Sequence, residues 1–108
     1  MDLRSIYRIA SAIYRQKGAF TLTDNKNELR EMTIPFALSV SDICEGVKGC
    51  RSYVDQLVRS SSSIGANLFE AEYGQSRADF IHKLEICLKE CSDTEYWLEL
   101  LHRKKQTV

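Results

Sequence analysis

The chain has 108 residues with 44% hydrophobic and 28% charged side chains, and its 15 basic residues balance its 15 acidic ones. This length leaves room for one domain with one core, and the composition argues against a disordered chain and against one that coats nucleic acid through an overall positive charge. No apolar run reaches the roughly 18–20 residues that a membrane span needs, and arginines interrupt the apolar N-terminus where a signal peptide has none, so we expect a cytoplasmic protein with no membrane partner.

The first predicted helix covers about residues 2–16, where apolar residues recur at three- and four-residue spacing. Its apolar stripe consists of Leu3, Ile6, Ala10 and Ile13, widened by Tyr7 and Tyr14. Its opposite side carries Arg4, Arg8 and Arg15. Lys17 and Gly18 are suited to ending the helix, because a cation complements the C-terminal dipole and glycine tolerates positive φ.

The second helix is predicted over about residues 33–47, after a linker at 18–32 with a loop at 23–25 and no more than a loose helical turn after it. Thr33 is placed as the N-cap and Pro35 in the first turn, where the missing N–H of proline costs nothing. The buried stripe is expected to contain Phe36, Val40, Ile43, Cys44 and Val47.

The third helix is predicted over about residues 51–73. Its middle contains four consecutive serines at 60–63, a composition with low helix propensity. We nevertheless expect one continuous helix, because the apolar and small residues keep helical spacing through positions 57, 61, 64 and 68. Small residues at these positions also allow a neighbouring helix to approach closely.

The fourth helix is predicted over about residues 76–105, a length of roughly 45 Å. Ser76 followed by Asp79 matches a variant of the capping box that starts helices. A heptad-like seam is formed by Phe80, Leu84, Cys87, Cys91, Thr94, Leu98 and Leu101. Because this helix carries more apolar surface than one bundle core needs, we expect it to contribute a subunit interface.

Helical periodicity dominates the chain, and neither strand alternation nor a low-complexity tract is evident. Four helices with mostly short connections favour an all-α protein, an antiparallel up-and-down four-helix bundle formed by a single domain over 1–108.

The four cysteines are expected to be reduced and to act as small apolar side chains. Cys87 and Cys91 are one helical turn apart within the apolar seam. A metal site would need a tighter cysteine pair or two copies of the Glu-x-x-His spacing, and here only Asp79-x-x-His82 and Glu99-x-x-His102 come near it. No nucleophile is paired with a base, so we predict no enzyme, no cofactor and no small-molecule substrate.

Two stretches resemble a known protein family. They are LVRSSSSIGANLFEA at 57–71 and QSRADFIHKL at 75–84, the second continuing through Leu88-Lys89-Glu90 and Thr94-Glu95-Tyr96-Trp97-Leu98. Over about residues 33–101 the chain is similar to the bacterial four-helix-bundle proteins named for reading frames in intervening sequences of 23S ribosomal RNA. Accessory proteins of diversity-generating retroelements share that fold. The resemblance implies a ring-shaped homopentamer, a partner that is RNA or a reverse transcriptase, and no catalytic residues.

The chain departs from the family pattern at both ends. Members usually begin near residue 33 and continue past Leu101 into a final helix, for which this chain has no room. Residues 2–13 instead resemble that final helix. We therefore expect a circularly permuted member, with its last helix moved to the front, which is feasible because both termini of an even-numbered bundle lie at one end.

In the permuted arrangement the first helix starts, and the fourth ends, at the same end of the bundle. That end would gather five basic residues: Arg4, Arg8, Arg103, Lys104 and Lys105. Aligned in a ring, they would form a surface for phosphate groups. The alternative is a solvated helix end with cations matched to the C-terminal dipole.

A second set of polar or aromatic residues lies in the family-like stretches: Arg59, Asn67, Glu70, Asp79, His82, Glu95 and Trp97. They are candidates for a subunit or ligand surface, although we favour the alternative that they form interhelical hydrogen bonds and ion pairs that set the register of the bundle. The sequence thus favours a non-enzymatic, oligomeric helical bundle associated with RNA. The alternative is a protein-interaction scaffold with no nucleic-acid role.

Overall fold

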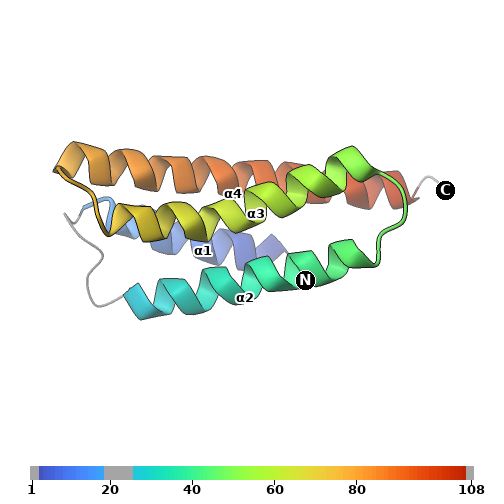
Figure 1. Cartoon of the computed structure of the whole chain (residues 1–108), viewed down its shortest axis with the longest axis horizontal. Coiled ribbons are helices and arrows are strands. Elements are labelled where there is room, and N and C mark those ends of the chain that lie inside the picture. Colours follow the sequence, from blue (N-terminus) through green and yellow to red (C-terminus); the bar gives the residue numbers. More distant parts are fainter. Residues whose placement is uncertain (1–2, 19–25, 107–108) are drawn as a thin grey trace.

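The computed structural model contains four α-helices packed side by side (Figure 1). It describes residues 3–18 and 26–106, and no strand occurs among them. The helices are α1 (Leu3–Gln16), α2 (Lys26–Glu45), α3 (Arg51–Ala71) and α4 (Arg77–Gln106). The all-α four-helix bundle expected from the sequence is therefore confirmed.

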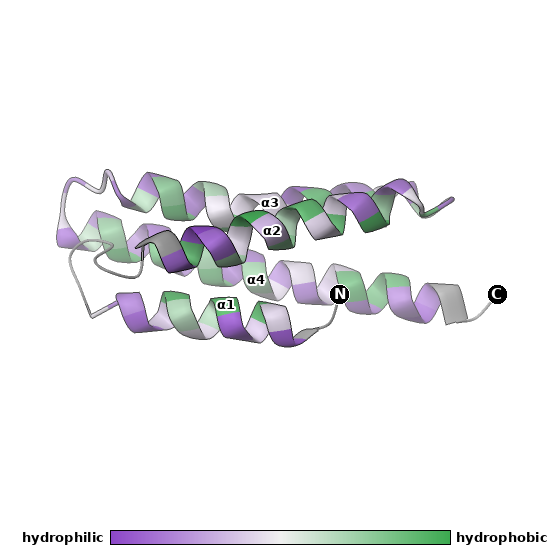
Figure 2. Ribbon diagram, turned by 90° about the horizontal axis from the view of Figure 1, so that it is seen from below, coloured by the Kyte–Doolittle hydropathy of each residue, from purple (hydrophilic) through white to green (hydrophobic). Residues whose placement is uncertain are grey.

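Helices that follow one another in the chain run antiparallel, as the ribbon in Figure 1 shows. Side-chain contacts between α3 and α4 give the same direction, because Glu70 meets Lys83 near one end whereas Ser60 meets Thr94 farther along. α1 packs on α4 and α2, so the first helix occupies the fourth corner of the bundle. Figure 2 shows that α1 begins partway along α4 and leaves the last turns of α4 uncovered by it.

The hydrophobic core contains residues from all four helices. Side chains with at most 1% exposure include Ile6, Ile9, Ile13, Leu29, Val40, Leu57, Ile64, Phe80 and Leu84. Burying a side chain of this size contributes about 1.5–3 kcal/mol. Because α1 supplies three of these isoleucines, it is part of the core rather than an appended arm.

The serine run does not interrupt α3, which confirms the continuous helix predicted from its apolar spacing. Ser60 and Ser61 are buried, at 0% and 1% exposure. The hydroxyl of Thr94 donates to Ser60 Oγ at 2.9 Å, and the Cys87 thiol donates to the Ile64 carbonyl at 3.5 Å. Small side chains on α3 thus allow α4 to approach closely, and packing outweighs their poor helix propensity.

α2 begins at Lys26, earlier than predicted, so residues 26–32 are helical rather than part of a linker. Thr33 is not an N-cap; its hydroxyl donates to the Leu29 carbonyl at 2.8 Å, and the residue is 2% exposed. Pro35 lies in the helix interior. The fully buried Leu29 explains the earlier start, because the core continues one turn before the position that resembled a cap. The loop predicted at 23–25 lies outside the described residues.

The Ser76 cap is confirmed, since the Asp79 N–H donates to Ser76 Oγ at 3.0 Å and the Asp79 carboxylate accepts from the Gln75 N–H at 3.2 Å. The turn between α2 and α3 contains Gly49 at φ 79° followed by Cys50 at φ 52°. Glycine suits the first of these positions because a left-handed backbone strains other residues. α2 and α3 end two residues before the predicted ends, at Glu45 and Ala71.

Among the described residues, more large apolar side chains are exposed on α2 than on α4. Ile34, Leu38 and Ile43 on α2 are 45%, 61% and 45% exposed, whereas Tyr96 is the large apolar residue exposed on α4. The apolar seam of α4 is absorbed by its contacts with α3 and α1. The surplus surface expected on the fourth helix is therefore found elsewhere. None of the described helices has the length and apolar character needed to cross a membrane.

Candidate nucleic-acid interface

One side of α1 carries three arginines without acidic partners. Arg4, Arg8 and Arg15 are all exposed, and their four- and seven-residue spacing places them on the same side of the helix. The sequence of α1 contains no Asp or Glu. Among residues 3–18 and 26–106, no ion pair involves these arginines. We call this set the arginine row.

Arginines elsewhere in the described part of the chain mostly have carboxylate partners. The pairs are Arg30–Glu72 at 2.9 Å, Arg103–Glu99 at 3.1 Å, Arg59–Glu90 at 3.2 Å and Arg51–Asp55 at 3.5 Å. A paired arginine offers less charge to an external anion than an unpaired one. The arginine row is thus the strongest local source of uncompensated positive charge that the geometry identifies.

The Tyr7 hydroxyl donates to Glu95 Oε1 at 2.9 Å and sets the register between α1 and α4. Arg4 is then level with about residue 98 of α4, and Arg103 lies about five residues farther, or roughly 7 Å along the axis. Arg8 lies about one helical turn beyond Arg4, farther from the end of the bundle at which α4 finishes. Arg4 thus lies about one and a half helical turns short of Arg103 along the axis, and the expected basic cluster is spread along α1.

The remaining cations of that cluster lie in the last turn of α4. Lys104 is exposed and has an interaction partner of its own, whereas the side chain of Lys105 lies outside the described part of the chain. Arg51 begins α3, which does not contact α1, and it is paired with Asp55, so it lies outside the arginine row.

Carboxylates of α2 border the arginine row on one side. Arg8 and Arg15 share a shallow groove of about 270 Å³ with Glu28. Arg8 also lines a groove of about 540 Å³ together with Glu31 and Asp42. These acidic residues repel phosphate from the α2 side of the row, and Glu95 and Glu99 do so on the α4 side, so an anion would approach α1 from its outward surface.

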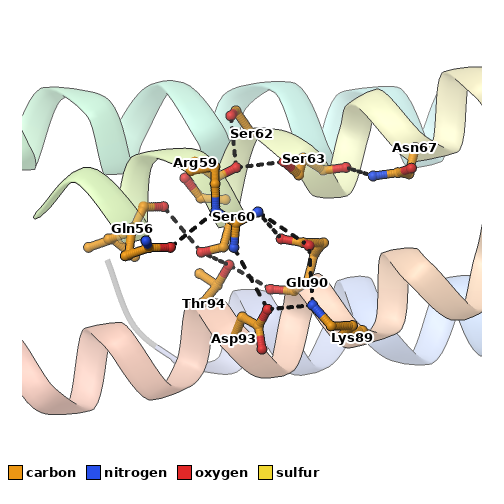
Figure 3. Close-up of polar contacts among 12 residues, drawn as sticks. Gln56, Arg59, Ser60, Ser62, Ser63, Asn67, Lys89, Glu90, Asp93 and Thr94 are labelled. Atoms are coloured by element: carbon orange, nitrogen blue, oxygen red, sulfur yellow. Dashed lines mark hydrogen bonds and ion pairs between the residues drawn. The ribbon is translucent and has the colours of Figure 1, made fainter. Parts of the chain in front are cut away.

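The second set of polar residues mostly makes contacts within the protein, several of which Figure 3 shows. Asn67 Nδ2 donates to the Ser63 carbonyl at 2.8 Å, and Glu70 pairs with Lys83 at 3.2 Å. Trp97 stacks on Tyr53 with ring centroids 6.0 Å apart. Asp79 caps α4 and Glu95 accepts from Tyr7, as described above. His82 is exposed.

Arg59 belongs to a polar cluster between α3 and α4 in which only Glu90 is buried (Figure 3). The Glu90 side chain is 8% exposed, and its carboxylate lies 3.2 Å from Arg59 Nη1 and 3.7 Å from Lys89 Nζ. Asp93 contacts the same two cations, at 3.8 Å and 3.1 Å. The cluster is saturated by its own members, an arrangement that fixes the register of two helices rather than binding a ligand.

Three of the four cysteines lie in the hydrophobic core. Cys44, Cys87 and Cys91 are buried, as predicted. Burial raises the pKa of the Cys87 and Cys91 thiols to about 12, so both are protonated near neutral pH and are poor nucleophiles. No group of three or more metal-ligating side chains occurs among the residues that the structure describes.

Comparisons with known proteins give one family and one solved structure. A family model described as 23S rRNA-intervening sequence protein matches residues 25–107 and leaves α1 outside the match. The chain is 42% identical to a crystal structure from Bacteroides thetaiotaomicron, a protein with unknown function from the S23 ribosomal protein family. That similarity covers 76% of each chain with a TM-score of 0.68. No curated protein matches the chain.

Proposed function

Because this chain belongs to the 23S rRNA-intervening sequence protein family, we propose that it is a non-enzymatic helical-bundle protein that binds RNA phosphates through the arginine row. The observation that carries the proposal is the exposure of Arg4, Arg8 and Arg15, which form no ion pair within residues 3–18 and 26–106, on a helix that has no acidic residue. The description of the family mentions ribosomal RNA, and the arginine row is the surface on which we place RNA binding.

The row suits a phosphate backbone in both length and chemistry. Arg4 and Arg15 are eleven residues apart, about 16 Å along the helix, which is close to five nucleotides of a strand at about 3.4 Å each. A guanidinium group binds phosphate with two parallel hydrogen bonds and remains charged at any physiological pH. Arg103, already paired with Glu99, would extend this surface less strongly.

A second candidate function is that of a protein-interaction scaffold, which a different surface favours. An apolar groove of about 460 Å³ lies between α2 and α3, with Ile34 and Leu38 on one wall and Ala66 and Phe69 on the other. An alanine side chain at Gly65 would come within 3.3 Å of Thr33 Oγ1, so glycine allows close approach there. We propose this groove as the contact between copies, in a homopentamer as the family resemblance implies, or with a reverse transcriptase.

The two functions are compatible, because the groove lies on α2 and α3 and the arginine row lies on α1. In a ring of identical subunits the row would be repeated around the assembly. Several weak contacts to one RNA molecule would then act together and raise the overall affinity well above that of one subunit.

RNA binding is tested with the Arg8→Gln/Arg15→Gln variant and a matched Arg51→Gln/Arg77→Gln control. Both variants lose two positive charges from exposed helix positions. In fluorescence anisotropy with a labelled RNA oligonucleotide, we expect the first variant to bind at least about tenfold more weakly than the control. Equal binding by the two variants would contradict a local role for the row. Absence of binding by the natural sequence at low salt would contradict the function and favour the scaffold.

Self-association is tested with Leu38→Glu and a Tyr73→Glu control, which place the same charge inside and outside the groove. Leu38 is 61% and Tyr73 is 79% exposed, so neither change should unfold the protein. By light scattering coupled to size-exclusion chromatography, we expect the natural sequence and the control to form an oligomer that Leu38→Glu reduces in mass. A monomeric natural sequence, or an unchanged mass for Leu38→Glu, would reject this interface.

A further inference from the structure

A short repeat in α1 places aromatic rings beside the arginine row. The triplet Ile-Tyr-Arg occurs at 6–8 and again at 13–15, seven residues or two helical turns apart. The two copies have the same environment in the bundle. Their isoleucines are buried at 1% and 0% exposure, whereas Tyr7 and Tyr14 are 52% and 66% exposed and the arginines are exposed as well.

The two tyrosines form a second row parallel to the arginines. Tyr7 lines the groove that Arg8 and Arg15 share with α2, but its hydroxyl bonds to Glu95 on α4. Tyr14 follows Tyr7 by two helical turns on the same side of α1, so the tyrosines lie on the α4 side of the arginine row. The Tyr7 hydroxyl is held by Glu95, and the Lys17 ammonium group lies 5.3 Å from the centre of the Tyr14 ring. Both side chains are therefore tethered without being buried.

Paired rows of aromatic rings and cations fit a single nucleic-acid strand. Exposed bases stack on aromatic side chains, while the backbone follows basic groups. In a duplex the bases are already stacked on one another, and the tyrosines would have nothing to bind. The repeats are about 10.5 Å apart, which corresponds to about three nucleotides of a stacked strand.

We propose that α1 binds single-stranded RNA, with bases stacked on Tyr7 and Tyr14 and phosphates held by Arg8 and Arg15. This inference rests on the proposed RNA-binding function and adds the class of RNA. Glu28 lies on the α2 side of the row, and Glu95 and Glu99 lie beside Tyr7 on the α4 side. The phosphates of a strand lying along α1 would therefore contact the arginines on the outward surface of the helix, with the bases turned toward the tyrosines.

The experiment compares two probes and three variants at one low salt concentration. The probes are a labelled single-stranded RNA of about twelve nucleotides and the same strand annealed into a blunt duplex. The variants are Tyr7→Leu/Tyr14→Leu, Tyr7→Phe/Tyr14→Phe, which keeps both rings, and Tyr73→Leu/Tyr96→Leu, which removes two exposed tyrosines outside α1. Circular dichroism and light scattering confirm that each variant keeps its fold and assembly.

We expect the natural sequence to prefer the single strand. The leucine variant on α1 should lose about fivefold or more in single-strand affinity per ring, at the lower end of what base stacking contributes, with duplex binding nearly unchanged. The phenylalanine variant and the control should bind like the natural sequence. Equal losses for both probes, or no loss, would overturn the single-strand inference while leaving phosphate binding intact. If neither probe binds, both the inference and the proposed function fail.

A change in assembly mass on removal of Tyr7 and Tyr14, with single-strand affinity retained, would also overturn the inference. It would assign the tyrosines to a contact between copies instead.

Discussion

Glu90 is a carboxylate held in the contact between α3 and α4, where its charge is stabilised mainly by Arg59 and Lys89. We predict that Arg59→Ala lowers the free energy of unfolding by about 1–2 kcal/mol, because it leaves a buried carboxylate with one cation instead of two. Urea denaturation followed by circular dichroism measures the change. Arg51→Ala serves as the control, since its pair with Asp55 is solvent-exposed and contributes about 0.5 kcal/mol at most. Equal losses for the two variants would show that the cluster does not stabilise the fold.

The buried thiols make stability depend on pH at the alkaline end. Burial raises the pKa of Cys87 and Cys91 from 9.0 to about 12, so the native state favours the protonated thiol. Their contribution to stability is complete below the unfolded pKa near 9 and is lost as the pH rises from about 9 to 12, where the unfolded chain releases the protons first. The raised pKa values of Tyr7, caused by its bond to Glu95, and of Lys89, caused by Asp93, act in the same direction.

We therefore expect the free energy of unfolding to fall steeply above pH 9, and to fall less steeply in Cys87→Ala/Cys91→Ala. Urea titrations at a series of alkaline pH values measure both slopes. Identical slopes in the variant and the natural sequence would mean that the thiols are not the titrating groups.

Burial of these cysteines could be predicted from the sequence because they lie in the apolar seam. The Arg59–Glu90 pair could not, because its partners are 31 residues apart and meet only once the helix register is set.

Within α3, buried and exposed serines differ in their effect on stability. Ser60 lies against α4 at 0% exposure, whereas Ser62 is exposed and bonds to carbonyls of its own helix. We predict that Ser60→Leu lowers the free energy of unfolding by about 1–3 kcal/mol through overpacking, whereas Ser62→Ala raises it by a few tenths of a kcal/mol through better helix propensity. Thermal and urea unfolding measure both changes. A Ser60→Leu protein as stable as the natural sequence would show that close packing of the two helices is not required there.

At the scale of whole helices, the spacing of apolar residues predicted where a helix continues. Local start signals were right for α4 and wrong for α2. The continuity of α3 and the cap of α4 followed from spacing and from Ser76–Asp79. The start of α2 did not, because Thr33 and Pro35 together imitate a helix start. Leu29 and Thr33 are both buried on the side of α2 that faces the bundle. Their burial stabilises one continuous helix even though Pro35 lies inside it. Such a tertiary contact leaves no local signal in the sequence.

The whole molecule is a four-helix bundle only because α1 is present, although the family match begins at residue 25. We predict that deletion of residues 1–18 abolishes cooperative folding, because Ile6, Ile9 and Ile13 would no longer cover the core. Moving the same residues behind residue 108 through a short Gly/Ser linker should restore it. The linker must span back about 12 Å, since α4 extends about eight residues beyond the level of Arg4.

Circular dichroism and cooperative urea unfolding distinguish these two chains. A deleted chain as soluble and stable as the natural one would reject the view that α1 is the moved final helix of the family. A permuted chain that fails to fold would do the same, provided that the linker is long enough.

Fold class, helix number and the basic character of α1 could all be predicted from the sequence. The site could be predicted only in part. The sequence placed Arg4 and Arg8 with Arg103 at one end of the bundle, but α1 starts partway along α4, so the arginines form a row along the helix instead. Which cations lack partners depends on contacts between residues far apart in the chain, such as Arg30–Glu72, and periodicity cannot supply these.

The central claim is that the arginine row binds RNA phosphates, and the salt dependence of binding tests it most directly. The slope of log affinity against log salt concentration is measured for a single-stranded RNA with the natural sequence, Arg8→Gln/Arg15→Gln and Arg51→Gln/Arg77→Gln. Loss of two phosphate contacts should reduce the slope by about 1.4, at about 0.7 per contact, in the first variant and leave it unchanged in the second. A slope near zero for the natural sequence would contradict phosphate binding by the arginine row. Equal slopes for the natural sequence and Arg8→Gln/Arg15→Gln would contradict it as well.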